Sequence, residues 1–343
     1  MILKKIDFII TWVDGNDPVW RAEKAKYEVQ IKGDSRDSRY RDWDTLRYWF
    51  RSIETNAPWV NKVYFVTCGH VPAWLNTECS KLVLVKHSDY IPDKYLPTFS
   101  SRAIDMNFHR IPELSEQFVY FNDDMFLIAP TVPNDFFKNG VPCDMGVLNA
   151  ITISAKGRSG EPLKKDEIYT PAVFNMALIN RHFDKKTSIK NNLSKWVNIR
   201  YGSAMIKTLL LLPWDQFTGF INPHLPYPYL KATYSEVWEK EADILGLASE
   251  HKFRTSTDVN HFVFSYWQLA KGQFYPRSNK FGLSCHLDGD KENFHMIIDA
   301  INKGKYKAIC INDEYVGDCF ENIKQKLIDS LQMKFPQKSS FEL

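Results

Sequence analysis

The chain has 343 residues, of which 44% are hydrophobic and 25% are charged. These values are typical of a soluble globular protein and exclude a disordered chain or a coiled coil. With 44 basic and 41 acidic residues the net charge is +3, which gives no general argument for nucleic-acid binding. The length allows one large α/β domain or two smaller ones. Aromatic residues reach 14%, which suits stacking on sugars or nucleotides but is also ordinary core mass.

The sequence predicts neither a targeting segment nor a disulfide framework. The first apolar run, residues 6–10, is too short for a signal peptide or a membrane helix. The six cysteines are scattered and include no C-x-x-C pair. This pattern predicts reduced thiols and a cytoplasmic location, and it argues against a zinc cluster.

The first half of the chain alternates predicted strands and helices. Apolar runs predict buried strands at residues 6–13, 62–67, 82–86 and 117–121. Helical spacing predicts one helix that is capped by Asp42 or Asp44 and ends before Pro58, and another over residues 100–111. This βαβ succession predicts a mostly parallel sheet covered by helices. Ligands bind beyond the carboxyl ends of such strands, so the polar residues 14–17 and 122–124 are expected at one crevice.

The second half is less regular. Residues 145–153 are predicted as a strand, residues 157–165 as a loop, and residues 222–229, with three prolines, as irregular chain. Further helices and a strand follow from the apolar spacing: helices at 175–212, 235–247, 259–271 and 319–331, and a strand at 307–312. The last helix is amphipathic, and two interpretations stay open: its apolar face packs on the core, or it rests on the inner face of a membrane.

Asn122, Asp123 and Asp124 follow a predicted buried strand directly. Adjacent carboxylates at such a place repel each other and lose solvation, so packing does not account for them. A divalent cation would relieve both effects, since hard cations prefer oxygen ligands. The alternative is a solvated turn. The sequence therefore offers Asp123 and Asp124 as candidate metal ligands.

Two pairs of candidate residues are spaced four apart on predicted helices. Arg47 and Arg51 are expected on the face opposite the apolar residues, where a solvated surface is the simpler interpretation for Arg51. Asp105 and His109 have the same spacing. A carboxylate that orients an imidazole serves catalysis in many sites, and an ordinary surface ion pair is the alternative.

Two further candidates lie in the second half. His224 stands between Pro223 and Pro226, which restrict the backbone and so favour a fixed imidazole; a structural or solvated histidine is the alternative. Arg254 precedes a predicted helix, where the helix dipole and the guanidinium both favour a phosphate. The alternative is that Asp258 caps this helix and pairs with Arg254.

Four blocks of the sequence resemble conserved regions of the Stealth family. The first region resembles residues 6–20, IDFIITWVDGNDPVW, and the second resembles residues 39–67 continuing to 96–126, which ends in NDDMF. The third region resembles residues 222–229 together with FRTSTDVNHFVFSYWQL, and the short fourth region resembles ICINDE. The family includes bacterial capsular-polysaccharide phosphotransferases and the animal enzyme that adds N-acetylglucosamine-1-phosphate to lysosomal glycoproteins.

The resemblance implies a fold similar to the GT-A nucleotide-sugar transferases, as one catalytic domain over residues 1–343. Its expected parts are a nucleotide-sugar-binding half (1–127), an acceptor and catalytic half (128–317) and a C-terminal helix and tail (318–343). The implied reaction transfers a hexose-1-phosphate or N-acetylhexosamine-1-phosphate from a nucleoside-diphosphate sugar, with a UDP-sugar as the expected donor. The acceptor is a hydroxyl of a capsular or cell-surface polysaccharide or a lipid-linked oligosaccharide, and a nucleoside monophosphate is released. Mg²⁺ or Mn²⁺ is the expected cofactor.

Carried over by motif, the family's active-site positions are Arg47, Asp105, Asp124, His224 and Arg254. Asp105 is a departure, because the animal enzyme has Glu there. His224 or Asp105 is expected to take the acceptor proton, and the arginines to neutralise the diphosphate. The expected substrate-binding residues are Trp12, Asp14, Gly15, Arg47, Ser101, His109, Asn122 and Asp258.

Two other functions remain open at this point. A conventional metal-dependent glycosyltransferase would attack the sugar carbon and release the nucleoside diphosphate. A non-catalytic carbohydrate-binding protein would also use the aromatic content. The released nucleotide distinguishes a conventional glycosyltransferase from a phosphotransferase. Turnover distinguishes either enzyme from a carbohydrate-binding protein.

Overall fold

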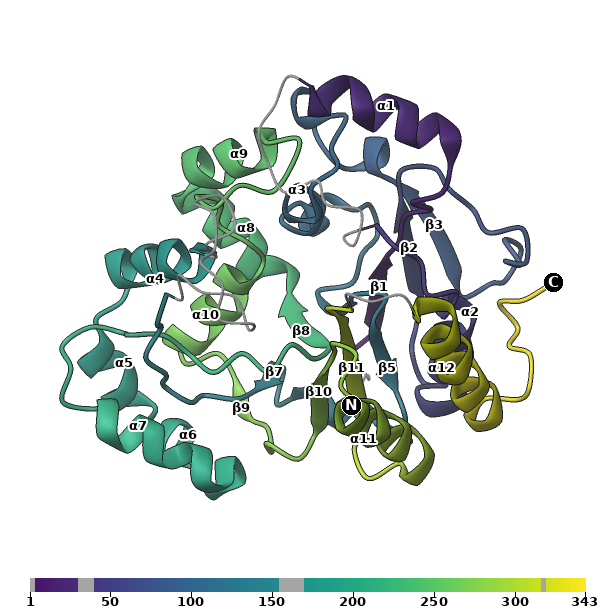
Figure 1. Cartoon of the computed structure of the whole chain (residues 1–343). Coiled ribbons are helices and arrows are strands. Elements are labelled where there is room, and N and C mark those ends of the chain that lie inside the picture. The colour runs from purple at the N-terminus through teal and green to yellow at the C-terminus, as the bar shows by residue number, and fades with distance from the viewer. Residues whose placement is uncertain (1–3, 30–39, 154–169, 316–318) are drawn as a thin grey trace.

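Five strands form the central sheet, in the order β3-β2-β1-β4-β8 (Figure 1). They are β1 (Ile6–Thr11), β2 (Val63–Thr67), β3 (Leu82–Lys86), β4 (Gln117–Phe121) and β8 (Tyr227–Leu230). β3, β2, β1 and β4 run parallel, and β8 runs antiparallel to β4. This computed structural model describes residues 4–29, 40–153, 170–315 and 319–343. The predicted α/β class with a mostly parallel sheet is confirmed.

Helices cover the sheet, which explains why its strands read as continuous apolar runs. Every residue of β2 and of β4 is buried, as expected for parallel strands covered on both faces. The helices of this first half are α1 (Pro18–Glu28), α2 (Leu46–Asn56) and the short α3 (Ser101–Asp105). Trp49, Phe50 and Ile53 of α2 are fully buried in the main core, so α2 supplies the apolar face that the sheet needs.

The predicted cap of α2 is wrong. The helix begins after Thr45, whose side chain makes no capping hydrogen bond. Asp44 lies just before it with a φ of +54° and forms an ion pair with Lys324 of α12 (Phe320–Lys334). Asp42 lines a cavity instead. Both carboxylates therefore have partners or surroundings that the local sequence does not reveal.

Two small sheets lie beside the central one. β10 (Gly282–Leu287) runs parallel to β11 (Ala308–Asp313), and β11 runs antiparallel to β5 (Met125–Leu127). The other sheet contains β6 (Phe137–Lys138), β7 (Val141–Asp144) and β9 (Tyr275–Pro276). Helices α11 (Lys291–Lys303) and α12 pack against each other beside β10 and β11 (Figure 1). The strand predicted at 307–312 and the helix predicted at 319–331 are both confirmed to within a few residues.

A group of helices occupies the opposite side of the molecule (Figure 1). It contains α4 (Pro171–His182), α5 (Lys185–Asn191), α6 (Leu193–Trp196), α7 (Met205–Leu211), α8 (Lys231–Lys240), α9 (Ala242–Glu250) and α10 (Phe262–Ala270). Short 3-10 turns connect parts of the chain: η2 (His87–Asp89), η3 (Asp93–Tyr95), η4 (Phe108–Arg110), η5 (Pro133–Asp135) and η6 (Ile199–Ala204). The single helices predicted over 175–212 and 235–247 are therefore wrong in extent, because each is broken into shorter ones. The loop predicted at 157–165 lies outside the described residues.

The prolines at 222–229 do not prevent a strand, although the sequence predicted irregular chain there. Pro228 lies in β8, opposite Val119 of β4. Leu230, two residues further on, donates its N–H away from β4 to Gln268 Oε1 at 3.0 Å. Residues two apart in a strand face the same way, so the missing N–H of Pro228 also points outward and costs no bond to β4.

Two other predicted elements are also wrong. The helix expected over residues 100–111 ends at Asp105, and His109 belongs to the separate turn η4. Residues 145–153 contribute only an isolated bridge between Leu148 and Phe220, because their backbone pairs with irregular chain rather than with a neighbouring strand.

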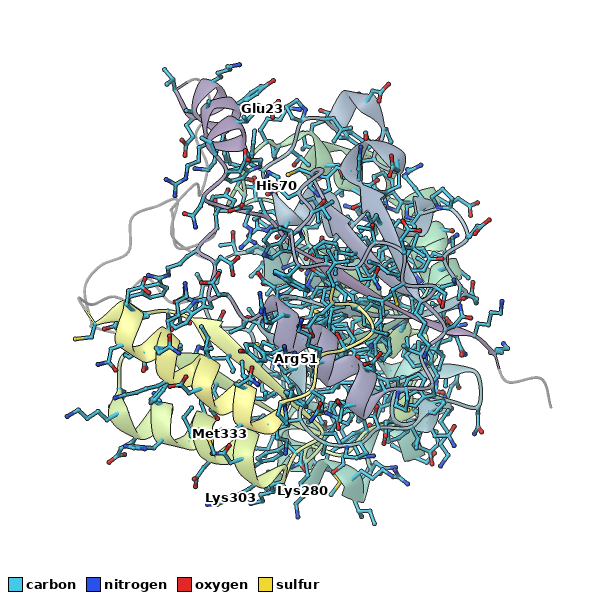
Figure 2. All side chains as sticks on the ribbon, turned by 90° about the vertical axis from the view of Figure 1, so that its right-hand side faces the viewer. Glu23, Arg51, His70, Lys280, Lys303 and Met333 are labelled. Carbon is cyan, nitrogen blue, oxygen red and sulfur yellow. The ribbon has the colours of Figure 1, made fainter. Side chains whose placement is uncertain are left out.

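The C-terminal helix packs on the core rather than presenting its apolar face to the outside. Leu327 and Leu331 are buried, and Arg51 of α2 lies beneath the chain that follows (Figure 2). Arg51 pairs with both carboxylate oxygens of Glu342 at 2.8 Å and donates to Phe335 O. The solvated surface predicted for Arg51 is therefore wrong, because the tail covers it. Among the described residues, none of the helices combines the length and apolar character needed to cross a bilayer.

Candidate active site

A cavity of about 1060 Å³ opens at the carboxyl ends of β1 and β4. Three strand ends supply its floor: Thr11 and Trp12 at the end of β1, Asn122, Asp123 and Asp124 just after β4, and Asn312, Asp313 and Glu314 at the end of β11. Because β1 and β4 run parallel, their polar exits share one edge of the sheet, as expected. Trp12 borders the cavity, whereas Asp14 is absent from the described residues that line it and donates its N–H to His70 Nδ1 at 2.9 Å.

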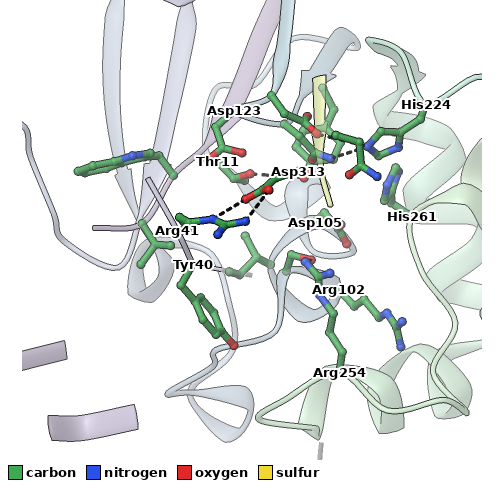
Figure 3. A pocket seen from close by; sticks show the side chains of 18 of the residues that line it. Thr11, Tyr40, Arg41, Arg102, Asp105, Asp123, His224, Arg254, His261 and Asp313 are labelled. Atoms are coloured by element: carbon green, nitrogen blue, oxygen red, sulfur yellow. Dashed lines mark hydrogen bonds and ion pairs between the residues drawn. The ribbon is translucent and has the colours of Figure 1, made fainter. Parts of the chain in front are cut away.

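Several carboxylates gather at the floor of this cavity. Asp124, Asp42 and Asp313 all lie close enough to Asp123 to interact with its charge, and Figure 3 shows Asp123 and Asp313 at the cavity. Asp123 is exposed, but the solvent that it reaches is that of the cavity, whose walls surround the carboxylate. Burial, and then the negative charges of Asp124, Asp42 and Asp313, raise its pKa to about 7. Burial also raises the pKa of Asp42.

This floor fits a hard divalent cation. Oδ1 of Asp124 is buried and has no hydrogen-bond partner among the described residues. A buried carboxylate oxygen without a partner is costly, and a cation would satisfy it while neutralising Asp123. Cys310 also lies close, with its Sγ 3.4 Å from Asp124 Oδ2. Burial raises the pKa of that thiol well above its usual value, so without a cation it donates a hydrogen bond to the carboxylate. Asp124, His224 and Cys310 each offer a ligand atom within 4.8 Å of the others.

His224 approaches the same carboxylate from the loop before β8. Its Nε2 lies 3.9 Å from Asp124 Oδ2 and 3.4 Å from Asn122 Nδ2, and its Nδ1 lies 2.8 Å from the hydroxyl of Tyr227. The φ of His224 is +41°. Non-glycine residues rarely adopt this left-handed region, and such strain is concentrated at functional sites. The structure thus holds the imidazole in place at both ring nitrogens, with the flanking Pro223 adding stiffness.

Arg254 and Asp105 lie on another wall of the cavity (Figure 3). Arg254 donates Nη2–H to Ser101 Oγ at 2.6 Å, so the predicted residue Ser101 orients the guanidinium. Asp105 is buried, and its Oδ1 has no hydrogen-bond partner in the described chain. Burial raises the pKa of Asp105 well above its usual range, although Arg254 and Arg102 oppose this shift.

Asp258 does not pair with Arg254, and it does not cap α10. Its Oδ2 accepts from Arg102 at 3.1 Å and its Oδ1 lies 2.6 Å from His251 Nδ1. These partners lower the pKa of Asp258 despite its burial. Asp258 is absent from the described residues that line the cavity, but it fixes Arg102, which is present. Asp258 can therefore affect the substrate only indirectly, because it holds Arg102 in place.

Three other predicted site residues lie elsewhere among the described residues, away from the cavity lining. Arg47 stacks 5.3 Å from the ring centre of Trp74. Gly15 is buried against the carbonyl of Tyr40, where a Cβ would be only 1.9 Å from the oxygen. His109 packs against the ring of Trp238, and burial lowers its pKa to about 3. Because α3 ends before His109, the pairing of His109 with Asp105 that helical spacing suggested does not form.

The sequence did not single out a clamp at one side of the floor. Arg41 donates from Nε and Nη2 to the two oxygens of Asp313, at 2.8 and 2.6 Å, and Trp43 Nε1 donates to Asp313 Oδ2 at 2.9 Å (Figure 3). Asp313 is the last residue of β11, and Asp123 lies two residues beyond the end of β4. A search for every carboxylate at a strand exit would have found it.

A second imidazole, His261, was also missed. Its Nδ1 lies 2.8 Å from the hydroxyl of Tyr229. Burial, and then the nearby His224 and Arg254, hold its pKa well below the usual value. His261 is therefore a neutral group on the cavity wall, beside His224 (Figure 3). His261 directly precedes the aromatic helix α10, and the local sequence there does not indicate a site residue.

Comparison with solved structures finds glycosyltransferases at low similarity. The galactosyltransferase LgtC, solved with donor and acceptor sugar analogs, is 8% identical, with a TM-score of 0.38 over 95% of each chain. The bifunctional glycosyltransferase WbbM is 11% identical, with a TM-score of 0.39 over 96% of this chain and 50% of its own.

Sequence comparison gives much closer relatives. Stealth protein CR1, conserved region 1, matches residues 4–30, and Stealth protein CR2, conserved region 2, matches residues 39–144. The capsular polysaccharide phosphotransferase WcwK of Streptococcus pneumoniae is 42% identical over 99% of this chain and 98% of its own. The receptor polysaccharide phosphotransferase WefC of Streptococcus gordonii is 40% identical over the whole of both chains. The exopolysaccharide phosphotransferase cps2G of Lactiplantibacillus plantarum is 38% identical over 98% of this chain and 96% of its own. With identity of this level along its full length, the chain belongs to the Stealth family and is a phosphotransferase enzyme.

Proposed function

We propose that this enzyme transfers a hexose-1-phosphate, or an N-acetylhexosamine-1-phosphate, from a nucleoside-diphosphate sugar to a hydroxyl of a growing surface polysaccharide. The acceptor oxygen bonds to the phosphorus that carries the sugar. The bond from that phosphorus to the bridging oxygen breaks, and the bridging oxygen leaves with the nucleoside monophosphate. The observation that carries this proposal is one cavity in which His224 lies 3.9 Å from Asp124, with Arg254 on its wall.

The cation is proposed to be Mg²⁺ or Mn²⁺, held by Asp123 and Asp124. Both carboxylates face the cavity, and the unpartnered Oδ1 of Asp124 favours such a ligand. When bound, the cation neutralises charge on the diphosphate oxygens. Without that neutralisation, a diphosphate that enters a cavity floor lined by carboxylates would meet strong repulsion.

Arg254 is proposed to hold the diphosphate from the opposite side. Its guanidinium is oriented by Ser101 and can grip two phosphate oxygens at once. Arg102, fixed by Asp258, adds positive charge on the same wall. Phosphoryl transfer depends mainly on such positioning and charge neutralisation. Arg47 lies away from this wall, against Trp74, so its predicted contact with the donor has no support from its position.

His224 is the better candidate for the general base. Its ring is held at Nδ1 by Tyr227, which leaves Nε2 on the side of Asn122 and Asp124. Asp105 is the other candidate, but its raised pKa favours the protonated carboxyl, which donates a hydrogen bond and cannot accept the proton. We therefore assign Asp105 to binding the substrate and His224 to taking the proton of the acceptor hydroxyl.

The donor and acceptor are proposed by analogy with the relatives. Their names specify capsular polysaccharide, receptor polysaccharide and exopolysaccharide, so the acceptor proposed here is a polysaccharide or lipid-linked oligosaccharide. The proposed donor, a UDP-sugar, follows from the family resemblance alone. We place the reaction in the cytoplasm, since the six cysteines in the described chain are free thiols. The α12 helix gives no support to membrane contact there, because its apolar face is packed.

The test is a panel of nucleotide sugars offered to the purified enzyme with a polysaccharide acceptor, reading the released nucleotide by chromatography. The proposal expects a nucleoside monophosphate. A nucleoside diphosphate would identify a conventional glycosyltransferase, and binding of donor without any turnover would identify a carbohydrate-binding protein.

A further inference from the structure

The outer face of α7 exposes apolar side chains instead of burying them. Ile206, Leu209 and Leu210 are spaced three and four residues apart, so they share one helix face, and Leu210 is 68% exposed. Trp214, just beyond the helix, is 57% exposed. Single exposed apolar residues are common, but a helix face of them together with a tryptophan marks a contact surface.

The opposite face of α7 is anchored in the molecule, so this exposure is built into the fold. Thr208 is buried and accepts a hydrogen bond from the N–H of Leu148 at 3.0 Å. Lys185 is buried as well, and its Nζ donates to the carbonyls of Leu211 and Trp214 at 2.6 Å. A cation at these C-terminal carbonyls stabilises the helix end. The apolar face is therefore held outward by a fixed inner face.

The charge around α7 indicates what covers this face. Residues 184–215 contain six basic residues and two acidic residues, Asp184 and Asp215, which is a surplus of positive charge in a chain whose total charge is nearly balanced. Lys186 and Lys190 lie one turn apart on α5 and are exposed. Lys186 pairs with Asp215 at 2.6 Å, which places it beside Trp214. The apolar face thus has a basic rim.

We propose that the outer face of α7 docks on the surface of an anionic lipid bilayer. Apolar side chains on an interfacial helix enter the boundary between headgroups and acyl chains, and a tryptophan is favoured at that depth. Basic side chains beside them are attracted to anionic headgroups. A second copy of this chain is a poorer occupant, because a symmetric contact would bring two basic rims together. This inference concerns where the enzyme sits and does not depend on its donor or acceptor.

The test is co-sedimentation of the full chain with vesicles of phosphatidylcholine containing about 30% phosphatidylglycerol, beside vesicles of phosphatidylcholine alone. We expect binding to the anionic vesicles that weakens with added salt. The variant Ile206→Ser/Leu210→Ser should lower the bound-to-free ratio on the order of tenfold or more, since both side chains lose their insertion. The matched control is Leu247→Ser/Val19→Ser, which changes two exposed apolar residues on α9 and α1 and should leave binding unchanged.

A second pair of variants separates the basic rim from net charge. Lys186→Gln/Lys190→Gln should weaken binding more than Lys240→Gln/Lys326→Gln, which removes the same charge from α8 and α12. Circular dichroism melting checks that each variant is folded. The proposal is overturned if the wild type does not bind anionic vesicles, or if the serine variant at α7 binds as well as its control. It is also overturned if light scattering shows a dimer that the α7 variant alone dissociates, because the face would then join two copies.

Discussion

The imidazole of His224 lies 3.9 Å from the carboxylate of Asp124, although the two residues come from different halves of the chain. Asp124 follows β4, and His224 precedes β8, the strand that pairs with β4 in antiparallel register. The antiparallel pairing therefore brings the start of one strand to the end of the other. Tyr227, the first residue of β8, fixes the other ring nitrogen. The site is thus assembled by the edge of the central sheet.

Replacing the imidazole tests the role of His224. His224→Ala should lower turnover on the order of 10²-fold or more, because the acceptor proton loses its base. Donor affinity should change little, since the imidazole contacts the acceptor side. The measurement is initial rate beside donor titration. Abolished donor binding in this variant would remove the assignment of His224 as base.

Replacing the guanidinium should give a different defect. Arg254→Ala should weaken both donor binding and turnover, because its contact with phosphate forms in the ground state and tightens in the transition state. Arg254→Lys should recover little, since a point charge does not reproduce the two-pronged grip. Titration and initial rates of both variants check this. Intact donor binding in Arg254→Ala, together with its loss in His224→Ala, would reverse the two roles.

Removal of divalent cations should stop the reaction. Asp123 and Asp124 would otherwise repel the diphosphate. We expect turnover to disappear after dialysis against chelator and to return with Mg²⁺ or Mn²⁺. Asp124→Asn should also lose turnover while the protein remains folded. Full activity in excess chelator would contradict the cation's role.

The raised pKa of Asp123 predicts a dependence of stability on pH. Its folded pKa, about 7, exceeds its unfolded value near 3.9. The folded state therefore binds the extra proton, and stability falls as pH rises from about 4 to about 7. In chelator at pH 8, Asp123→Asn should melt about 2–4 °C above wild type, and the two should melt together below pH 4. Saturating Mg²⁺ should remove or reverse the difference. A constant difference at every pH would show that Asp123 is not the titrating group.

The buried ion pair of the C-terminal tail should contribute strongly to stability. Arg51→Ala leaves Glu342 buried without its partner, which costs about 3–5 kcal/mol. The control is Lys303→Ala, which breaks the exposed pair with Asp299 and should cost under about 0.5 kcal/mol. Urea unfolding followed by circular dichroism measures both. Equal losses of unfolding free energy in the two variants would mean that the pair of Arg51 and Glu342 does not anchor the tail on α2.

Local patterns were enough to predict the strands and one part of the site. The apolar runs at β1 and β4 are uninterrupted, and carboxylates at a buried strand exit, such as Asp124, have few structural explanations. Long-range partners could not be predicted in this way. Arg51 lies on the polar side of a predicted helix, and only the folded tail shows that Glu342 covers it. The clamp of Arg41 on Asp313 joins segments whose approach the sequence does not encode locally.

Continuity of a helix was the other source of error. The spacing of Asp105 and His109 suggested a pair only because the helix was assumed to continue, and α3 ends at Asp105. The family resemblance also named Arg47, whose side chain stacks on Trp74 and is absent from the described residues that line the cavity, so its role in the site stays a prediction. His261 lies in an apolar helix start, where a histidine is usually a core residue, so only its place beside His224 reveals it.

The position of the donor's phosphorus after reaction tests phosphotransfer most directly. A UDP-sugar labelled with ³²P at the phosphorus that carries the sugar is incubated with the enzyme, Mg²⁺ and acceptor polysaccharide. We predict that the label becomes bound to the polysaccharide through an acid-labile phosphodiester and that unlabelled UMP is released in equal amount. Label that remains in released UDP, with unlabelled sugar on the polysaccharide, would contradict the account.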